Sequence, residues 1–205
     1  MELITKYFTL NDIQYRQMQL LGELYPQWNE KINVISRKDI SNLYPNHILH
    51  SLAIARFITP IDETRILDMG TGGGFPGIPL AIMWPQCQFH LIDRIGKKIK
   101  VAQSIAEEIG LNNVTFQHGD IGECRQKYDF VVSRAVMRLD ELVPLIRKNI
   151  SNKSRNAYPN GLICLKGGDL ASEMYKVNEP ILEEDLSTYF KHPFFETKKL
   201  IYVQI

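Results

Sequence analysis

The stretch 65–77, RILDMGTGGGFPG, decides how this chain folds. It begins with a short apolar run, as expected of a buried strand, and continues into a turn that holds Gly70, Gly72, Gly73, Gly74 and Gly77. Glycine adopts positive φ without strain and lets a backbone approach a ligand closely. The following residues, 78–84, can continue as a helix, since Pro79 is tolerated in a first helical turn. A strand, a glycine-rich turn and a helix N-terminus in this order predict a nucleotide-binding corner.

Two classes of ligand fit such a corner. Gly72, Gly74 and Gly77 match G-x-G-x-x-G, the dinucleotide pattern, which so many glycines satisfy easily. Asp68 stands two residues before Gly70 and gives D-x-G-x-G-x-G. A pyrophosphate gains nothing from that carboxylate, whereas a ligand with an ammonium or sulfonium group does. The stretch therefore resembles motif I of S-adenosylmethionine (SAM)-dependent methyltransferases, and a tight turn without a ligand is the alternative.

Composition sets the limits on the class of protein. A chain of 205 residues with net charge +1 is long enough for one domain with a small appendage and is not a globally basic nucleic-acid binder. The three cysteines are scattered without a C-x-x-C pair, which indicates a reducing compartment without disulfides or a zinc site. The N-terminus lacks a signal peptide, and no apolar run reaches the roughly 20 residues of a membrane span. We expect a cytoplasmic monomer with no membrane partner.

The pattern of apolar residues divides the chain near residue 60. Residues 1–60 read as an N-terminal helical cap, whereas strands and helices alternate over residues 61–205. Such alternation predicts an α/β, Rossmann-like methyltransferase fold with a mostly parallel, doubly wound sheet. The expected strands are 65–69, 88–93, 113–117, 128–133, 161–166, 186–191 and 199–205, and the expected helices include 96–109, 139–150 and a segment within 169–185.

Two further stretches fall at the ends of predicted strands, where ligands bind in open α/β sheets. Asp93 ends the second strand and can accept both ribose hydroxyls of an adenosine, which suits SAM and NAD equally; a helix N-cap is the alternative. The loop 118–123 follows the third strand, and the main chain of Ile121 and Gly122 could read an adenine edge. An ordinary turn is the alternative for this loop.

The fourth predicted strand ends in Val132-Ser133-Arg134-Ala135. This is neither the N/D-P-P-Y/F clamp of methyltransferases that act on exocyclic amines nor the cysteine nucleophile needed for cytosine C5. The target should therefore need little activation, as a ring nitrogen such as guanine N7 does. Because no proton leaves that nitrogen, no general base is expected, and catalysis would consist of positioning the two reactants.

Several lysines lack local partners. Lys97, Lys98 and Lys100 lie in the first turn of the helix 96–109, where they oppose the helix dipole and have no acidic residue four positions on. We expect them to meet RNA phosphates beside the cofactor pocket; a solvated face is the alternative. Lys166, after the fifth strand, could face the target base or a phosphate. The histidines show no metal-ligand spacing, so no metal is predicted. His47 and His50, three residues apart on a predicted helix without a third ligand, are assigned to a polar surface.

Taken together, these residues resemble the RsmG (GidB) family of bacterial small-subunit rRNA guanine-N7 methyltransferases. The resemblance covers nearly the whole chain. It rests on Trp28-Asn29 with 32–36 (W-N…N-L-T-S), 47–51 (H-I-L-D-S), 68–77 (D-V-G-T-G-x-G-x-P-G), 96–98 (G-K-R), 133–135 (S-R-A) and 165–167 (L-K-G). Two positions depart from the family pattern: His50 stands where Asp is usual, and Gly122 where Glu is common.

The resemblance implies SAM contacts at Gly70, Phe75, Ile121, Gly122 and Arg134, where Gly122 can offer only its main chain. With Asp68, Gly72 and Asp93, these residues make up the predicted cofactor site. The resemblance also implies methylation of guanine N7 at position 527, in the 530 loop of 16S rRNA, with the rRNA or the small ribosomal subunit as partner.

Two other functions stay open from the sequence. A small-molecule SAM methyltransferase is permitted by the near-neutral charge, although the lysine cluster and the helical cap argue against it. A non-catalytic RNA-binding assembly factor with a vestigial pocket is disfavoured by the presence of Asp68, Gly70 and Asp93.

Overall fold

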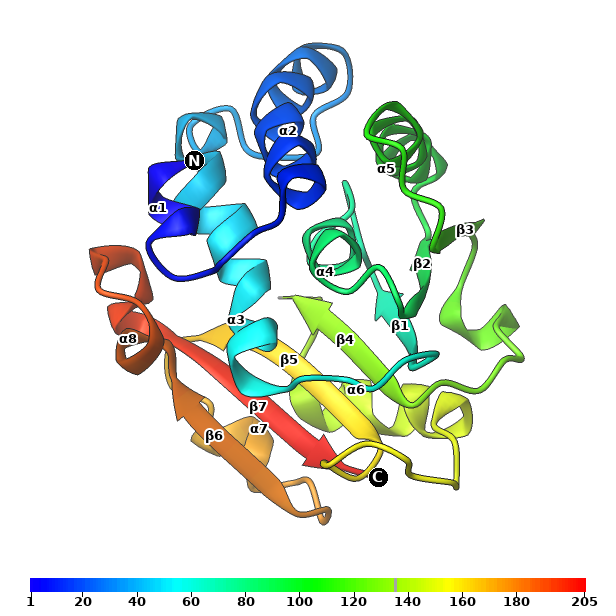
Figure 1. Cartoon of the computed structure of the whole chain (residues 1–205). Coiled ribbons are helices and arrows are strands. Elements are labelled where there is room, and N and C mark those ends of the chain that lie inside the picture. Colours follow the sequence, from blue (N-terminus) through cyan, green and yellow to red (C-terminus); the bar gives the residue numbers. More distant parts are fainter. Residues whose placement is uncertain (135) are drawn as a thin grey trace.

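A twisted sheet forms the centre of the molecule (Figure 1), whose computed structural model describes residues 1–134 and 136–205. Over these residues the sheet has seven strands in the order β3-β2-β1-β4-β5-β7-β6. Strands β1 to β5 pair in parallel, and β7 lies antiparallel between β5 and β6. The bounds are β1 Arg65–Met69, β2 Gln88–Asp93, β3 Val114–His118, β4 Phe130–Arg134, β5 Gly161–Gly167, β6 Ile181–Asp185 and β7 Lys198–Gln204. The predicted mostly parallel, doubly wound sheet is confirmed, and its order reverses between β1 and β4, where such sheets bind ligands.

Helices cover both faces of this sheet (Figure 1). One buried cluster joins the sheet to α2, α3, α4 and α5, and a second joins it to α6. Successive side chains of a strand point to opposite faces, so Ile66 enters the first cluster and Leu67 the second. The helices are α1 Glu2–Thr5, α2 Asp12–Lys31, α3 His50–Phe57, α4 Gly77–Met83, α5 Gly96–Glu108, α6 Leu139–Ile146, α7 Ala171–Met174 and α8 Leu186–Tyr189.

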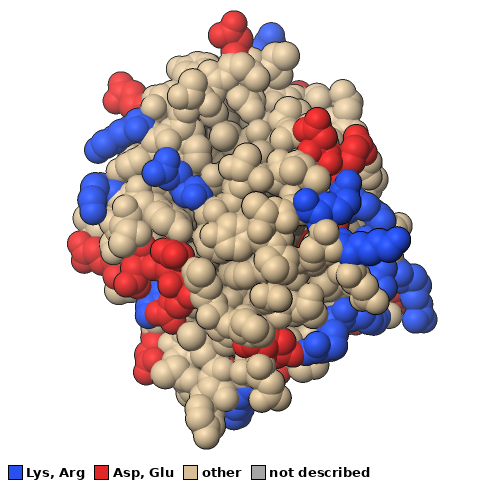
Figure 2. Space-filling view, turned by 60° about the horizontal axis from the view of Figure 1, so that its bottom comes forward, with Lys and Arg blue, Asp and Glu red and all other residues tan. Residues whose placement is uncertain are grey.

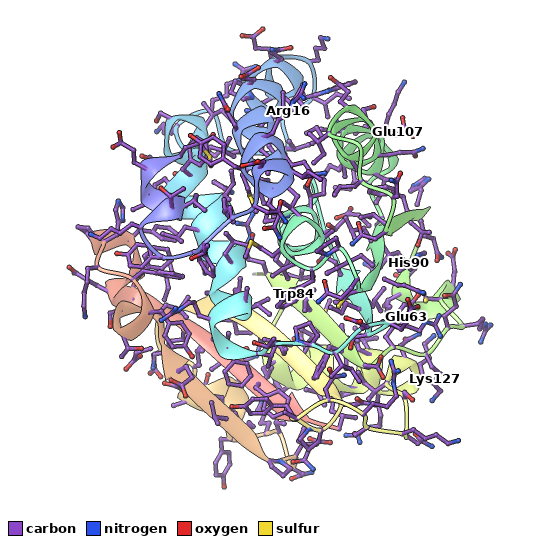
Figure 3. The ribbon with its side chains drawn as sticks, viewed as in Figure 1. Arg16, Glu63, Trp84, His90, Glu107 and Lys127 are labelled. Carbon is purple, nitrogen blue, oxygen red and sulfur yellow. The ribbon has the colours of Figure 1, made fainter. Side chains whose placement is uncertain are left out.

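The first 60 residues are largely helical, as expected, and pack on the same core as the main domain. Helix α2 begins at a capping box, in which Asn11 accepts from the Gln14 N–H at 2.9 Å and Gln14 accepts from the Asn11 N–H at 3.0 Å. Figure 3 shows α2 beside α5, and the Trp28 indole donates to Glu108 at 3.1 Å across this contact. Glu108 thus has a hydrogen-bond partner in α2, although an acidic residue is unfavourable at a helix C-terminus. A domain boundary at residue 60 stays a prediction.

The C-terminal part corrects two predicted elements. Within 169–185 only α7 is helical, and 181–185 forms strand β6; the expected strand at 186–191 is instead the short helix α8. Pro180 cannot continue a helix, and the following residues pair with β7 along the edge of the sheet. Leu186 and Phe190 are buried, and the Phe190 ring packs against that of Phe195, so tertiary packing overrides the strand-like pattern there.

The surface carries local patches of charge despite the net charge of +1. Figure 2 shows a face on which Lys and Arg gather along one side, with several Asp and Glu toward the opposite side. In the described part of the chain, no helix has both the length and the apolar character needed to cross a membrane. The same residues contain no cluster of three or more His, Cys, Asp or Glu that could hold a metal ion.

Candidate functional site

A cavity of about 540 Å³ opens at the carboxyl ends of β1, β2 and β4. Its volume is in the range of small-molecule sites. Seven of the predicted cofactor- and RNA-binding residues line it, namely Gly70, Gly72, Phe75, Asp93, Lys98, Ile121 and Arg134. The structure therefore brings together most of the predicted cofactor residues from four separate stretches of the chain.

Asp68 shapes the glycine turn from beneath. It is fully buried and does not line the cavity. Its Oδ2 accepts from the Thr71 hydroxyl at 2.5 Å and from the Gly77 N–H, at the start of α4, at 2.8 Å. The carboxylate thus joins the end of β1 to the beginning of α4, with the turn held between them. A direct contact between Asp68 and a cationic ligand stays a prediction.

The turn itself requires glycine at Gly70. This residue has φ +71°, and a Cβ there would come within 2.6 Å of the Val136 side chain. A larger residue would therefore be strained and would also displace the segment after β4, which lines the same cavity.

The protonation of Asp68 should make stability depend on pH. Burial raises the pKa of Asp68 to about 7, against the opposing effects of Thr71, Gly77 and Arg134. Because the pKa of an unfolded aspartate is about 4, this group contributes stability that is fully present below pH 4 and lost as the pH rises to about 7. We expect the free energy of unfolding of the wild type to fall over this range relative to that of Asp68→Asn, which does not titrate. Urea denaturation of both proteins from pH 4 to 8 measures the difference, and parallel pH profiles would contradict the raised pKa.

Asp93 both organises the turn and faces the cavity. Its Oδ2 accepts from the Gly72 N–H and its Oδ1 from the Ile95 N–H, each at 2.8 Å. A carboxylate has about four lone-pair sites, so both oxygens can still accept ribose hydroxyls. The helix N-cap considered as the alternative is not what the structure shows: Ile95 is the N-cap residue of α5, and Asp93 accepts from the N–H of that residue, ahead of the helix.

The loop after β3 contributes one of its two predicted residues. Ile121 is buried and lines the cavity. The contact expected from Gly122 is not supported, because its N–H donates to Asp120 Oδ1 at 2.7 Å and its carbonyl accepts from Lys148 at 2.7 Å. An adenine contact in this loop would fall to the main chain of Ile121.

Arg134 ends a chain of hydrogen bonds that begins in the N-terminal helices. Its guanidinium lies 4.9 Å from the centre of the Phe75 ring and donates to His47 Nδ1 at 3.2 Å. A guanidinium only donates, so His47 carries its proton on Nε2, which lies 2.6 Å from Asp39 Oδ2. Burial, together with the charge of Arg134, lowers the pKa of His47 to about 4, so the ring is neutral near pH 7. The assignment of His47 to a polar surface is therefore wrong.

The charge of Arg134 has no direct counterion among the residues that the structure describes. Burial lowers its pKa to about 10, which still leaves it charged near pH 7. Among the described residues no carboxylate forms an ion pair with it, and Asp39 is reached only through His47. A cation withdrawn from water needs an anionic partner. Arg134 is therefore suited to pair with a carboxylate of a ligand, such as that of the amino-acid part of SAM. Asp93 is suited to accept hydrogen bonds from the ribose hydroxyls.

Comparison with known proteins agrees with this geometry. The sequence model of the GidB family, described as rRNA small subunit methyltransferase G, matches residues 14–197. The ribosomal RNA small subunit methyltransferase G of Phocaeicola vulgatus is 58% identical, with 100% of this chain and 99% of that protein covered. The protein of the same name from Bacteroides thetaiotaomicron is 56% identical, with 100% of both chains covered.

The chain belongs to this family. The resemblance to the RsmG (GidB) family is thereby confirmed. Among solved structures, fibrillarin from Aeropyrum pernix, with natively bound SAM, has a TM-score of 0.56 at 13% identity over 76% of this chain and 73% of its own. The predicted fold of SAM-dependent methyltransferases is confirmed as well.

The four lysines predicted to bind RNA in this member of the rRNA small subunit methyltransferase G family differ in their surroundings. Lys98 is half-buried and lines the cavity, whereas Lys97 and Lys100 are exposed. Lys166 is engaged within the protein, because its ammonium donates to Glu173 Oε2 and to the Met137 carbonyl, each at 2.8 Å. These two bonds use two of the three N–H groups of the ammonium, so a contact from Lys166 to the target base or to a phosphate stays a prediction.

The end of β4 shows how the family's S-R-A motif is used here. Ser133 is buried and its hydroxyl donates to the Met69 carbonyl at 3.0 Å, so it ties β4 to β1. Arg134 faces the cavity. Ala135, the third residue of the motif, lies outside the described residues.

Sequence reasoning missed His47, Asp39 and Glu173. His47 lies in the stretch 47–51 that resembles a family motif, which was a usable signal. His50, the family's usual Asp position, is 6% exposed and packs edge-on against Phe194 and Phe195. Burial lowers the pKa of His50, so it is a neutral core residue here, and its assignment to a polar surface is wrong as well.

Proposed function

We propose that this protein transfers a methyl group from SAM to N7 of a guanine in 16S rRNA, at the 527 position of the 530 loop that the family resemblance implies. The observation that carries the proposal is the half-buried Arg134 cation without a carboxylate partner among the described residues, in the same cavity as Asp93 and the glycine turn. These groups together suit a nucleoside that also bears an amino-acid carboxylate.

Each part of the site has a role in holding SAM. Arg134 would bind the carboxylate and Asp93 the ribose hydroxyls, while Gly70 and Gly72 allow the turn to approach the ligand closely. Ile121 would contact the adenine. When bound, SAM supplies a methyl group on a sulfonium centre.

The acceptor side needs positioning and no proton transfer. Guanine N7 has a free lone pair, so the side chains only have to align it with the methyl group and exclude water. Apolar residues that line the cavity, including Met69, Ile92 and Val136, serve the exclusion of water. A cytosine C5 target would need a thiolate. All three cysteines are buried and do not line this cavity.

The lysines at the start of α5 supply a test of RNA binding. Replacing Lys97 and Lys98 by alanine together should weaken binding to small-subunit rRNA and reduce the slope of log affinity against log salt by about 1 for each phosphate that is no longer bound. The matched control is the pair Lys6→Ala and Lys191→Ala, which is exposed near α1 and α8, on the side of the fold away from α5 (Figure 1). Filter binding over a salt series measures both; equal slopes for the two double variants would contradict the phosphate role.

The reaction itself is tested with radiolabelled SAM and small-subunit particles that lack the family's methyl group. Nucleoside analysis should recover the label as 7-methylguanosine at one rRNA position. Label in another nucleoside would contradict the N7 target and keep the SAM-dependent reaction. Binding of SAM without transfer would favour an assembly factor or a small-molecule substrate. A monomeric state and a cytoplasmic location stay predictions.

A further inference from the structure

A second hollow of about 270 Å³ adjoins the cofactor cavity. The two share Val136 and Met137 as lining residues, so they lie on either side of the segment that follows β4. Lys166 and Gly167, at the end of β5, and Glu173 of α7 also line the second hollow. It therefore opens at the carboxyl edge of the sheet, where a methyl acceptor has to lie beside the methyl donor.

The wall of this hollow holds a carboxylate and an ammonium group side by side. Glu173 is 8% exposed, and its Oε2 accepts both from Lys166 Nζ, at 2.8 Å, and from the Leu139 N–H. None of the hydrogen bonds among the described residues goes to Oε1 of Glu173. Lys166 also donates to the Met137 carbonyl at 2.8 Å, and its ammonium has a third N–H. A nearly buried ion pair is weak evidence for a stabilising role, and this pair lines a hollow that adjoins the cofactor cavity.

We infer that this hollow binds the target guanine by its Watson–Crick edge, an inference that rests on the proposed function. Glu173 Oε1 would accept from guanine N1–H and from the N2 amine, and Lys166 would donate to O6. Among the four RNA bases only guanine presents one acceptor next to two donors on that edge. N7 lies beyond O6 on the Hoogsteen edge, so these contacts leave it free to face the cofactor cavity.

The same contact would assist the reaction. The N7 lone pair forms the new N–C bond while the C–S bond breaks and its electron pair goes to sulfur, so no proton is transferred. The purine gains a positive charge, and its N1–H becomes a stronger donor. The bond from N1–H to Glu173 therefore strengthens in the transition state, which is the condition for a contribution to kcat.

The decisive variant is Glu173→Gln. Its amide oxygen can stay with Leu139 and Lys166, which places the NH₂ group where Oε1 stood, facing the donors of guanine. We expect kcat on small-subunit particles to fall about 100-fold, with the affinity for S-adenosylhomocysteine unchanged. The matched control is Glu183→Gln, which alters the glutamate of another Glu–Lys pair, that with Lys199 on β6 and β7, and should leave kcat unchanged.

A change of substrate gives a second, independent measurement. Inosine at the target position lacks the N2 amine, and the wild type should methylate it about 10-fold more slowly than guanine. In Glu173→Gln the preference for guanine should disappear. Equal wild-type rates on guanine and inosine would overturn the inference even if the variant failed to fold, and so would an unchanged kcat in Glu173→Gln. If the wild type forms no 7-methylguanosine at all, the proposed function fails. If the wild type forms 7-methylguanosine and neither Glu173→Gln nor inosine changes the rate, only this inference fails.

Discussion

Asp68→Ala is expected to lower the free energy of unfolding by about 2–5 kcal/mol and to abolish methyl transfer. The substitution removes the one acceptor of the Thr71 hydroxyl and the Gly77 N–H, and burial keeps water from replacing it. Without that junction the end of β1 no longer holds the start of α4, and the glycine turn loses the shape that lines the cofactor cavity. Urea denaturation and transfer of radiolabelled methyl groups measure the two effects.

Asp68→Asn distinguishes the hydrogen bonds that hold the glycine turn from the negative charge of the carboxylate. The amide oxygen can accept both hydrogen bonds, so most of the stability that Asp68→Ala removes should return. If Asp68→Ala proved as stable as the wild type and still bound S-adenosylhomocysteine, the carboxylate would have no organising role in the turn.

Arg134→Ala is expected to weaken the binding of S-adenosylhomocysteine about 100-fold, the effect of removing two charge-assisted hydrogen bonds to a carboxylate. Methylthioadenosine, which lacks the amino-acid part, should bind to wild type and variant with nearly the same affinity. Isothermal titration with both ligands measures the difference. If the affinities for the two ligands fell equally, the pocket would have collapsed and Arg134 would not bind the carboxylate.

The hydrogen bonds that link Arg134 through His47 to Asp39 allow a second test, with a smaller expected effect on ligand binding. His47→Ala removes the residue that links Arg134 to Asp39 by hydrogen bonds. The variant should bind S-adenosylhomocysteine about 10-fold more weakly, the effect of losing one hydrogen bond to a charged group. Its affinity for methylthioadenosine should not change. His47 acts through Arg134 and is a positioning residue. The matched control is His90→Ala on β2, labelled in Figure 3, whose ring bonds to Thr115 and Gln117 outside the cofactor cavity. It should bind both ligands as the wild type does.

Much of the fold could be predicted because its signals are local. The strand at 65–69, the glycine turn and the helix 96–109 were expected from apolar runs and glycines within short windows, and the structure confirms them as β1, the turn and α5. The region 169–191 could not be predicted in the same way. Ile181–Asp185 is a strand because β7 offers it an edge to pair with, a partner from distant sequence.

The functional site, like the fold, has one part with local sequence signals and one part that depends on tertiary packing. Asp68, Asp93 and the glycines stand at strand ends whose spacing alone points to a nucleoside ligand, so the sequence by itself determined the kind of fold and the kind of cofactor corner. Only the tertiary structure decided that His47 supports Arg134 across 87 residues and that Lys166 is held by Glu173. The physical reason is that the ionisation and freedom of a side chain depend on burial and on partners, which are set by how distant segments pack.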